Sequence, residues 1–484
     1  MNDTNNSLFN MKAHVSDFPA TFEENLVYVL VEILLFLGTI WIILKKKNSN
    51  TLKNLTKSEE EDLITKYTPE DLVPEISSTH HALNPRVLQG KVGYKVVIDG
   101  VERLNFATHD YLGFMGNEEF ENETKECISV YGVGACGPRG FYGTSIHHLE
   151  LEQQLAQFLG TEDSIMISYG FSTIASTIPA YAKKNDIVFV DEKCNYAIQQ
   201  GLRASKSEIK YFKHNDMQDL ERILEETKNI DLLNLRKARK SRRHMVVEGI
   251  YFNTGEICDL PNVIKLCKKY KLRIFMDESI SFGVLGKTGR GITEYFGIPL
   301  NDVDLIMGSF EFAFASVGGF CAGSRFLVDH LQAAALGYMF SASLPPLLVK
   351  ASLLALNEIQ THPEKLEKLQ TICNCMHDKL INSTVINKYF HVSGGVDSPV
   401  HVLTLRRDGK QDDQEAIILN ISDFCFQRNI VITAAARLPE SDVALTRPGI
   451  RITTNINHTE SLITNLILIL EEACYHTFNY RNSL

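Results

Sequence analysis

The pattern of apolar and polar positions divides the chain into a short apolar run, a polar stretch and a long body. The apolar run covers residues 26–44 and contains one charged side chain, Glu32. About 20 apolar residues cross the hydrocarbon core of a bilayer as a helix, so we predict one transmembrane helix over 26–44. Glu32 either faces a partner helix or a lipid head group, or is protonated or close to the interface, and the sequence leaves both alternatives open.

Charges on the two sides of this run predict its orientation. Residues 1–25 carry four carboxylates and one lysine, whereas Lys45, Lys46 and Lys47 follow the run at once. Positive charge favours the cytosolic side, so we expect a lumenal N-terminus and a cytosolic body. A cleaved signal peptide fits poorly, because the run is too long, its positive charge is on the wrong side and no small-residue cleavage site follows.

From about residue 91, apolar runs of strand length alternate with stretches of helical length. The runs are rich in β-branched residues, which predicts an α/β sheet with helices on both faces. The predicted strands are Ile165–Ser168, Ile187–Val190, Ile209–Phe212, Met245–Glu248, Arg273–Met276, Leu305–Gly308 and Gly319–Ala322.

The chain is expected to have five parts. Polar residues and the sequence Ser58–Asp62 suggest a linker with a capped amphipathic helix, and Pro345-Pro346 precedes a helix-rich stretch and a smaller α/β set. The expected parts are a lumenal N-terminus (1–25), a transmembrane helix (26–44), a linker (45–90), a large domain (91–345) and a helical connection with a small C-terminal domain (346–484).

Composition excludes some classes of function. The net charge of −10 argues against a nucleic-acid-binding protein. The ten cysteines have no regular spacing, and the close pair Cys373 and Cys375 has no second pair with which to form a zinc site. We therefore expect free thiols in a reducing compartment and no bound metal.

Four segments of the body carry chemical information. Residues 105–113 read Asn-Phe-Ala-Thr-His-Asp-Tyr-Leu-Gly, and residues 131–144 contain five glycines, which permit close approach of the backbone to a ligand or a partner chain. Residues 308–319 read Gly-Ser-Phe-Glu-Phe-Ala-Phe-Ala-Ser-Val-Gly-Gly, and residues 340–346 read Phe-Ser-Ala-Ser-Leu-Pro-Pro. Together these segments resemble the α-oxoamine synthases, which use pyridoxal phosphate (PLP) to condense an amino acid with an acyl-CoA. The resemblance implies the fold-type I architecture, with a seven-stranded, mostly parallel sheet and a small C-terminal α/β domain.

Three of the four positions that carry catalysis in that family are altered here. The family's PLP-binding lysine corresponds to Phe312, whose phenyl ring cannot form a Schiff base, and no residue from 288 to 349 is lysine. By the same resemblance, the histidine that stacks on the cofactor ring corresponds to Asn195, and the histidine near its phenolic oxygen to Ile280. The aspartate that holds the pyridinium nitrogen corresponds to Asp277, which alternatively only caps the next turn. We therefore expect no catalytic residue in this chain.

The resemblance also implies a role at the active site of a partner. In the family, active sites lie at a dimer interface, and the region corresponding to Ser341, Ala342 and Ser343 lies close to the PLP phosphate of the partner. Hydroxyl and N–H donors suit that contact, and the alternative is a turn that only orders the domain junction. Arg451 stands where the family has an arginine for the amino-acid carboxylate, so it binds substrate or is vestigial.

These expectations favour one function and leave two alternatives. We expect a non-catalytic subunit of a heteromeric α-oxoamine synthase of the endoplasmic-reticulum membrane, inactive alone, with PLP held covalently by a lysine-bearing catalytic subunit. Small membrane regulatory subunits, the lipid bilayer and acyl-CoA are the other expected partners. The alternatives are a self-sufficient synthase with non-covalent PLP and a membrane scaffold with no role at an active site.

Overall fold

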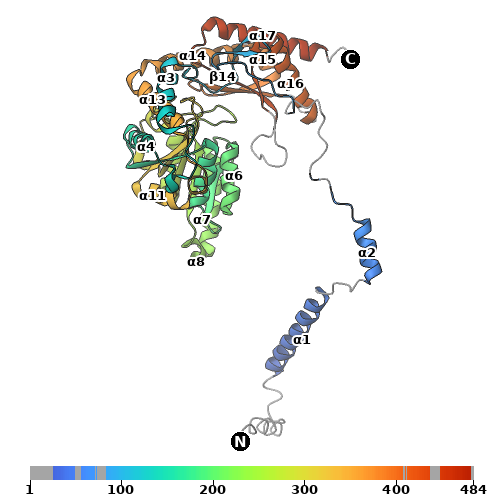
Figure 1. Ribbon diagram of the computed structural model, residues 1–484. Helices are drawn as coiled ribbons and strands as arrows, with labels where there is room; N and C mark the ends of the chain where they lie inside the picture. Colours follow the sequence, from blue (N-terminus) through green and yellow to red (C-terminus); the bar gives the residue numbers. More distant parts are fainter. Residues whose placement is uncertain are drawn as a thin grey trace, which may run out of the picture. The chain divides into compact units, whose positions relative to one another are not determined.

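The computed structural model describes residues 26–49, 56–70, 72, 83–406, 409, 411–435 and 447–480. The chain divides into two units, Met1–Pro85 and Arg86–Leu484 (Figure 1). The predicted lumenal segment, residues 1–25, lies outside the described residues.

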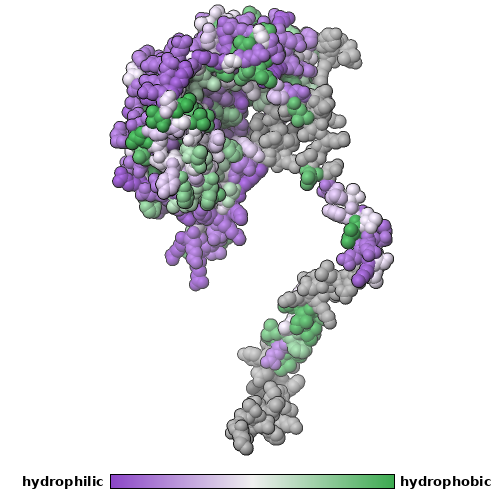
Figure 2. All heavy atoms as spheres, viewed as in Figure 1, coloured by the Kyte–Doolittle hydropathy of each residue, from purple (hydrophilic) through white to green (hydrophobic). Residues whose placement is uncertain are grey.

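The described part of the first unit contains the helices α1 (Leu26–Ser49) and α2 (Lys57–Lys66). Apolar side chains of α1 are exposed along residues 30–44 (Figure 2). Within the described residues, no helix is both long enough and apolar enough to cross a membrane, so the transmembrane helix predicted over residues 26–44 is not confirmed. A capping box begins α2: the Thr56 hydroxyl accepts from the Glu59 N–H, and the Glu59 carboxylate accepts from the Thr56 N–H.

The second unit is built on a sheet of the seven strands that the sequence predicts, with ends that differ by at most two residues. Its order is β3-β9-β8-β7-β6-β4-β5, and only β9 is antiparallel to its neighbours. The bounds are β3 (Asp163–Ile167), β4 (Ile187–Asp191), β5 (Glu208–Phe212), β6 (Arg243–Glu248), β7 (Arg273–Asp277), β8 (Leu305–Ser309) and β9 (Gly319–Gly323).

Helices cover both faces of this sheet, as the apolar runs predict (Figure 1). Successive strand residues alternate between the two cores: Met245 and Val247 contribute to one core and Val246 to the other. One core includes α4 (Ile146–Leu159), α7 (Met217–Leu233), α9 (Leu260–Tyr270) and α13 (Pro346–Thr361), and the other includes α5 (Gly170–Tyr181), α6 (Tyr196–Ser205) and α11 (Arg325–Ala334). The remaining elements of this region are α3 (Glu118–Tyr131), η2 (Arg139–Gly143), α8 (Leu235–Ala238), α10 (Ile292–Tyr295), η3 (Leu300–Asp302) and α12 (Leu336–Met339).

A smaller antiparallel sheet with the order β10-β11-β14-β13 forms a third core with the C-terminal helices. A hairpin from the start of the unit, β1 with β2, pairs with β12, so both ends of the unit contribute to this small domain. The bounds are α14 (Glu364–Asn382), α15 (Thr384–Tyr389), β10 (Phe390–Ser393), β11 (Val400–Leu405), α16 (Gln411–Gln427), β12 (Ile430–Val431), β13 (Thr433–Ala435), β14 (Gly449–Thr453), α17 (Glu460–Tyr480), β1 (Lys95–Ile98) and β2 (Val101–Asn105).

Candidate functional site

A cavity of about 220 Å³ lies where β4, β6 and β7 end and α5 begins. Carboxyl ends of parallel strands meet at one edge of a sheet, where α/β proteins place their ligands. The structure brings the three altered catalytic positions, Asn195, Ile280 and Phe312, and the retained Asp277 to the wall of this one cavity.

Asn195 connects the ends of three strands. It follows β4 and caps α6, because its side-chain oxygen accepts from the N–H of Ile198 at 3.0 Å. Its side-chain amide donates to Asp277 Oδ2 at 2.7 Å, and its backbone N–H donates to Glu248 Oε1 at 2.7 Å. The Asp277 carboxylate also accepts from the N–H of Ser279 at 2.9 Å, so it caps the following turn as well.

Sequence reasoning missed Glu248, the last residue of β6 and the register neighbour of Asp277 on β7. Both carboxyls are buried. Burial, and next the nearby Asp277, raise the pKa of Glu248 to about 8, and burial also raises the pKa of Asp277. The sequence does contain a signal for Glu248: like Asp277, it directly follows an apolar run of strand length.

Phe312 lies in the turn between β8 and β9 and belongs to an aromatic cluster. Its ring centroid is 4.8 Å from that of His109 and 6.0 Å from that of Phe252. The Arg451 guanidinium lies over the Phe252 ring, 4.4 Å from its centroid, in cation–π geometry. Burial, and next the charge of Arg451, lower the pKa of His109 well below its usual value, so this imidazole is neutral. The structure thus brings Arg451 close to the cavity residue Phe252.

These residues do not fit a covalently held PLP. Phe312 supplies no amine for an imine, and its ring is packed against His109. The carboxylate that would hold a pyridinium nitrogen, Asp277, already accepts the side-chain amide of Asn195. The cavity therefore offers no amine for covalent attachment of PLP. Its Asp277 carboxylate is already hydrogen-bonded within the chain.

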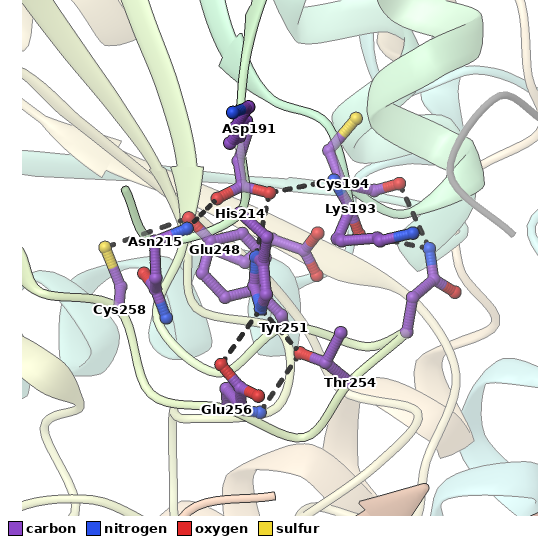
Figure 3. Close-up of polar contacts among 12 residues, drawn as sticks. Asp191, Lys193, Cys194, His214, Asn215, Glu248, Tyr251, Thr254, Glu256 and Cys258 are labelled. Atoms are coloured by element: carbon purple, nitrogen blue, oxygen red, sulfur yellow. Dashed lines mark hydrogen bonds and ion pairs between the residues drawn. The ribbon is translucent and has the colours of Figure 1, made fainter. Parts of the chain in front are cut away.

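A second polar network supports the loop that carries Asn195 (Figure 3). His214 Nδ1 lies 2.9 Å from Asp191 Oδ1 and its Nε2 lies 3.2 Å from Glu256 Oε2. Burial opposes protonation, but the hydrogen bonds with Asp191 and Glu256 dominate and raise the pKa of His214 to about 9. Asp191 also accepts from the N–H of Lys193, so a charged imidazolium helps to fix the start of this loop.

The Ser341-Ala342-Ser343 turn binds the glycine-rich loop of its own chain. Ser343 is buried, its N–H donates to the Gly137 carbonyl at 2.8 Å, and its hydroxyl donates to the Gly143 carbonyl. Ser341 is half-buried and Ala342 is exposed. The Ser343 hydroxyl and the Ala342 carbonyl, which accepts from the Ser168 hydroxyl, are therefore used inside this chain, whereas the half-buried Ser341 is partly accessible.

An ion pair holds the same loop from its other side. Arg139, the first residue of η2, binds Glu152 of α4 through two contacts of 2.7 and 2.9 Å, and its Nε donates to Thr144 Oγ1 at 3.0 Å. The next residues, Phe141 and Tyr142, have exposed side chains. The loop thus exposes two aromatic rings next to a residue, Arg139, that is anchored by its contacts with Glu152 and Thr144.

Comparisons with known proteins agree with this architecture. Residues 101–468 match the family model described as aminotransferase class I and II. The chain is 38% identical over 435 residues to long chain base biosynthesis protein 1b of Oryza sativa subsp. japonica, covering 90% of this chain and 89% of that protein. It is 36% identical over 477 residues to serine palmitoyltransferase 1 of Dictyostelium discoideum, covering 97% of each.

Solved structures share the fold. A serine palmitoyltransferase of S. paucimobilis, solved with a bound PLP–myriocin aldimine, matches with a TM-score of 0.72 at 24% identity and covers 87% of this chain and 96% of its own. This match confirms the predicted fold-type I α/β architecture. With the family match and the two relatives, it leads to one assignment: the chain belongs to the aminotransferase class I and II family, among the proteins named long chain base biosynthesis protein 1 and serine palmitoyltransferase 1.

Proposed function

We propose that this chain is the non-catalytic subunit of a heteromeric serine palmitoyltransferase. That enzyme joins L-serine to palmitoyl-CoA with loss of carbon dioxide and gives 3-ketosphinganine, the first step of sphingolipid long-chain base synthesis. The names of the relatives support this assignment. The observation that carries the non-catalytic role is Phe312, which stands in the cavity without an amine and is packed into an aromatic cluster.

A lysine-bearing catalytic subunit holds PLP covalently in this proposal. The surface around the glycine-rich loop supports a contact with that subunit, because Phe141, Tyr142 and Phe340 are all exposed there. Exposed aromatic side chains are enriched at protein interfaces. In this proposal Ser341 and Ala342 donate to the PLP phosphate of the partner, and Ser343 positions the loop beside them.

The proposal includes a membrane anchor. The apolar run 26–44, followed by three lysines, supports a single transmembrane helix with a lumenal N-terminus and a cytosolic body in the endoplasmic-reticulum membrane. Small membrane regulatory subunits contact this helix, and Glu32 is the polar group available to them. A tether suits the reaction, because its long-chain product partitions into the bilayer.

Borohydride labelling tests where the cofactor is held. The complex is solubilised with its co-purifying chains, treated with PLP and borohydride, digested and mapped by mass spectrometry. We expect the reduced PLP–lysine adduct on a co-purifying chain and activity only in the complex. A self-sufficient synthase predicts instead that the isolated chain binds PLP and turns over acyl-CoA. An adduct at the cofactor site of this chain contradicts the proposal.

Two serine substitutions distinguish an active-site role from a scaffold. Loss of one hydrogen bond to a charged group costs about 1.5–3 kcal/mol, so Ser341→Ala should lower kcat/KM of the complex about tenfold or more without loss of assembly. Ser324→Ala is the matched control, since this half-buried serine precedes α11 and makes no side-chain cap. A scaffold predicts that Ser341→Ala and the control give equal activity.

A further inference from the structure

We propose that one of the chain's own carboxylates, Glu311, closes the cavity to phosphate by occupying the N-terminus of α5. This inference goes beyond the proposed function, which requires only that the chain lack a cofactor lysine. In this inference Glu311 excludes an anionic cofactor, a role that none of the four catalytic positions has.

Helix α5 begins without a side-chain cap from the residue that precedes it, Tyr169. Instead, Glu311 Oε1 accepts from the N–H of Gly170, the first residue of the helix, at 3.0 Å. Helix N-termini have unpaired N–H groups and a partial positive charge, which makes them binding positions for anions. Here the anion is a carboxylate from a turn that is 141 residues away in the sequence.

Contacts within its own turn fix Glu311 in this position. Its N–H donates to Ser309 Oγ at 3.0 Å, and its neighbour Phe310 is fully buried against Phe320, with ring centroids 5.4 Å apart. The contact is also close, because a Cβ added at Gly170 would lie 2.4 Å from Ser309 Oγ and 3.1 Å from Glu311 Oε2. A phosphate could reach the helix terminus only if this anchored turn moved.

The composition of the cavity wall also disfavours phosphate. Its acidic residues are Glu248, Asp277 and Glu311, and none of the residues that line it is lysine or arginine. An incoming phosphate would lose its hydration close to three carboxyl groups and would meet no cation. The missing lysine and the filled anion position are therefore two separate barriers to the cofactor.

Binding of inorganic phosphate tests the proposal directly. The solubilised complex, with the site of its partner saturated with PLP, is dialysed to equilibrium against radiolabelled phosphate. Glu311→Ser and Glu311→Ala vacate the helix terminus, so each should add about one bound phosphate per chain relative to wild type. Glu311→Asp is the matched control, since it keeps the charge and should add none. Circular dichroism establishes that each variant is folded.

Two results would overturn the proposal. One is that folded Glu311→Ser and Glu311→Ala bind no more phosphate than wild type, because the terminus would then not be an anion position. The other is that the wild-type chain already binds phosphate in its own cavity. Neither result affects the labelling experiment on the partner lysine, so failure of this inference and failure of the proposed function are distinguishable.

A second experiment restores the amine. In Phe312→Lys the introduced amine can condense with an aldehyde, with loss of water, and borohydride then reduces the C=N bond to a stable secondary amine. We expect an adduct with pyridoxal, which has no phosphate, and at least tenfold less with PLP. Adding Glu311→Ser should raise the PLP adduct to the pyridoxal level. Equal adducts with PLP and pyridoxal in Phe312→Lys alone would contradict the exclusion.

Discussion

The ion pair between Arg139 and Glu152 gives the strongest quantitative prediction for the glycine-rich loop. The two side chains are 6% and 12% exposed, and two parallel contacts join them. Glu152 also accepts from the N–H of Met166, and Arg139 donates to Thr144. Truncating either partner leaves the other buried without its counter-charge.

The burial of this ion pair decides how much its removal should lower the free energy of unfolding. Exposed ion pairs contribute about 0–1 kcal/mol, whereas removing one partner of a buried pair costs about 3–5 kcal/mol. We therefore expect Arg139→Met and Glu152→Leu each to lower the free energy of unfolding by about 3–5 kcal/mol. The double variant leaves no unpaired charge, so it should cost less than the sum of the two single variants.

Urea unfolding followed by circular dichroism measures these differences. A matched control is the pair Arg428 and Glu472, which has a similar contact distance of 2.8 Å but is 53% exposed on both sides. Its variants should change the free energy of unfolding by at most about 1 kcal/mol. If Arg139→Met costs no more than the control, or if the double variant is additive, the reasoning from burial is wrong.

Three further predictions concern other parts of the site. The pKa of His214 is about 9 in the folded chain, above the usual value of about 6.5. The stabilisation of the folded state by protonated His214 is therefore complete below about pH 6.5 and is lost as pH rises through about 9. His214→Gln should therefore cost up to about 3 kcal/mol near neutral pH and flatten the alkaline side of a thermal-stability profile. Gly143→Ala should lower the activity of the complex at least tenfold in a palmitoyl-CoA assay, because its Cβ would lie 2.2 Å from the Gly137 carbonyl oxygen; unchanged activity would show that the loop tolerates a shift. Arg451→Met should leave that activity within about twofold if Arg451 only stacks on Phe252, and a raised KM for serine would instead show that it binds substrate.

Much of this architecture could be predicted from the sequence because it depends on local patterns. Strands buried on both faces read as short apolar runs, so all seven strands of the large sheet were predicted. The resemblance to a family pattern grouped Asn195, Asp277, Ile280 and Phe312, and each lies at or shortly after the end of a strand. Such positions converge on one edge of a parallel sheet whatever the intervening helices contain.

Other features depend on contacts between distant segments and could not be predicted in the same way. Glu311 reads as a polar residue in a turn until α5 is placed beside it. Ser343 was grouped with Ser341 as a donor for the partner, but its hydroxyl is directed to Gly143, 200 residues away. The protonated His214 depends on Asp191 and Glu256, which come from two other segments of the chain.

Different contacts stabilise the cavity and the glycine-rich loop of this chain, which bears on the proposed role beside a catalytic partner. In the cavity, Asn195 donates to Asp277 and Glu311 accepts from the first N–H of α5, so both carboxylates are hydrogen-bonded within the chain without a cofactor. The glycine-rich loop depends instead on Arg139, which pairs with Glu152, and on Ser343, which donates to the Gly143 carbonyl. A substitution that disturbs only the cavity should therefore leave the glycine-rich loop in place. A substitution of Arg139 or Ser343 should instead disturb the proposed partner surface, even when the cavity is intact. A glycine-rich loop that is fixed by contacts within its own chain suits the proposed role, in which this chain completes the active site of another.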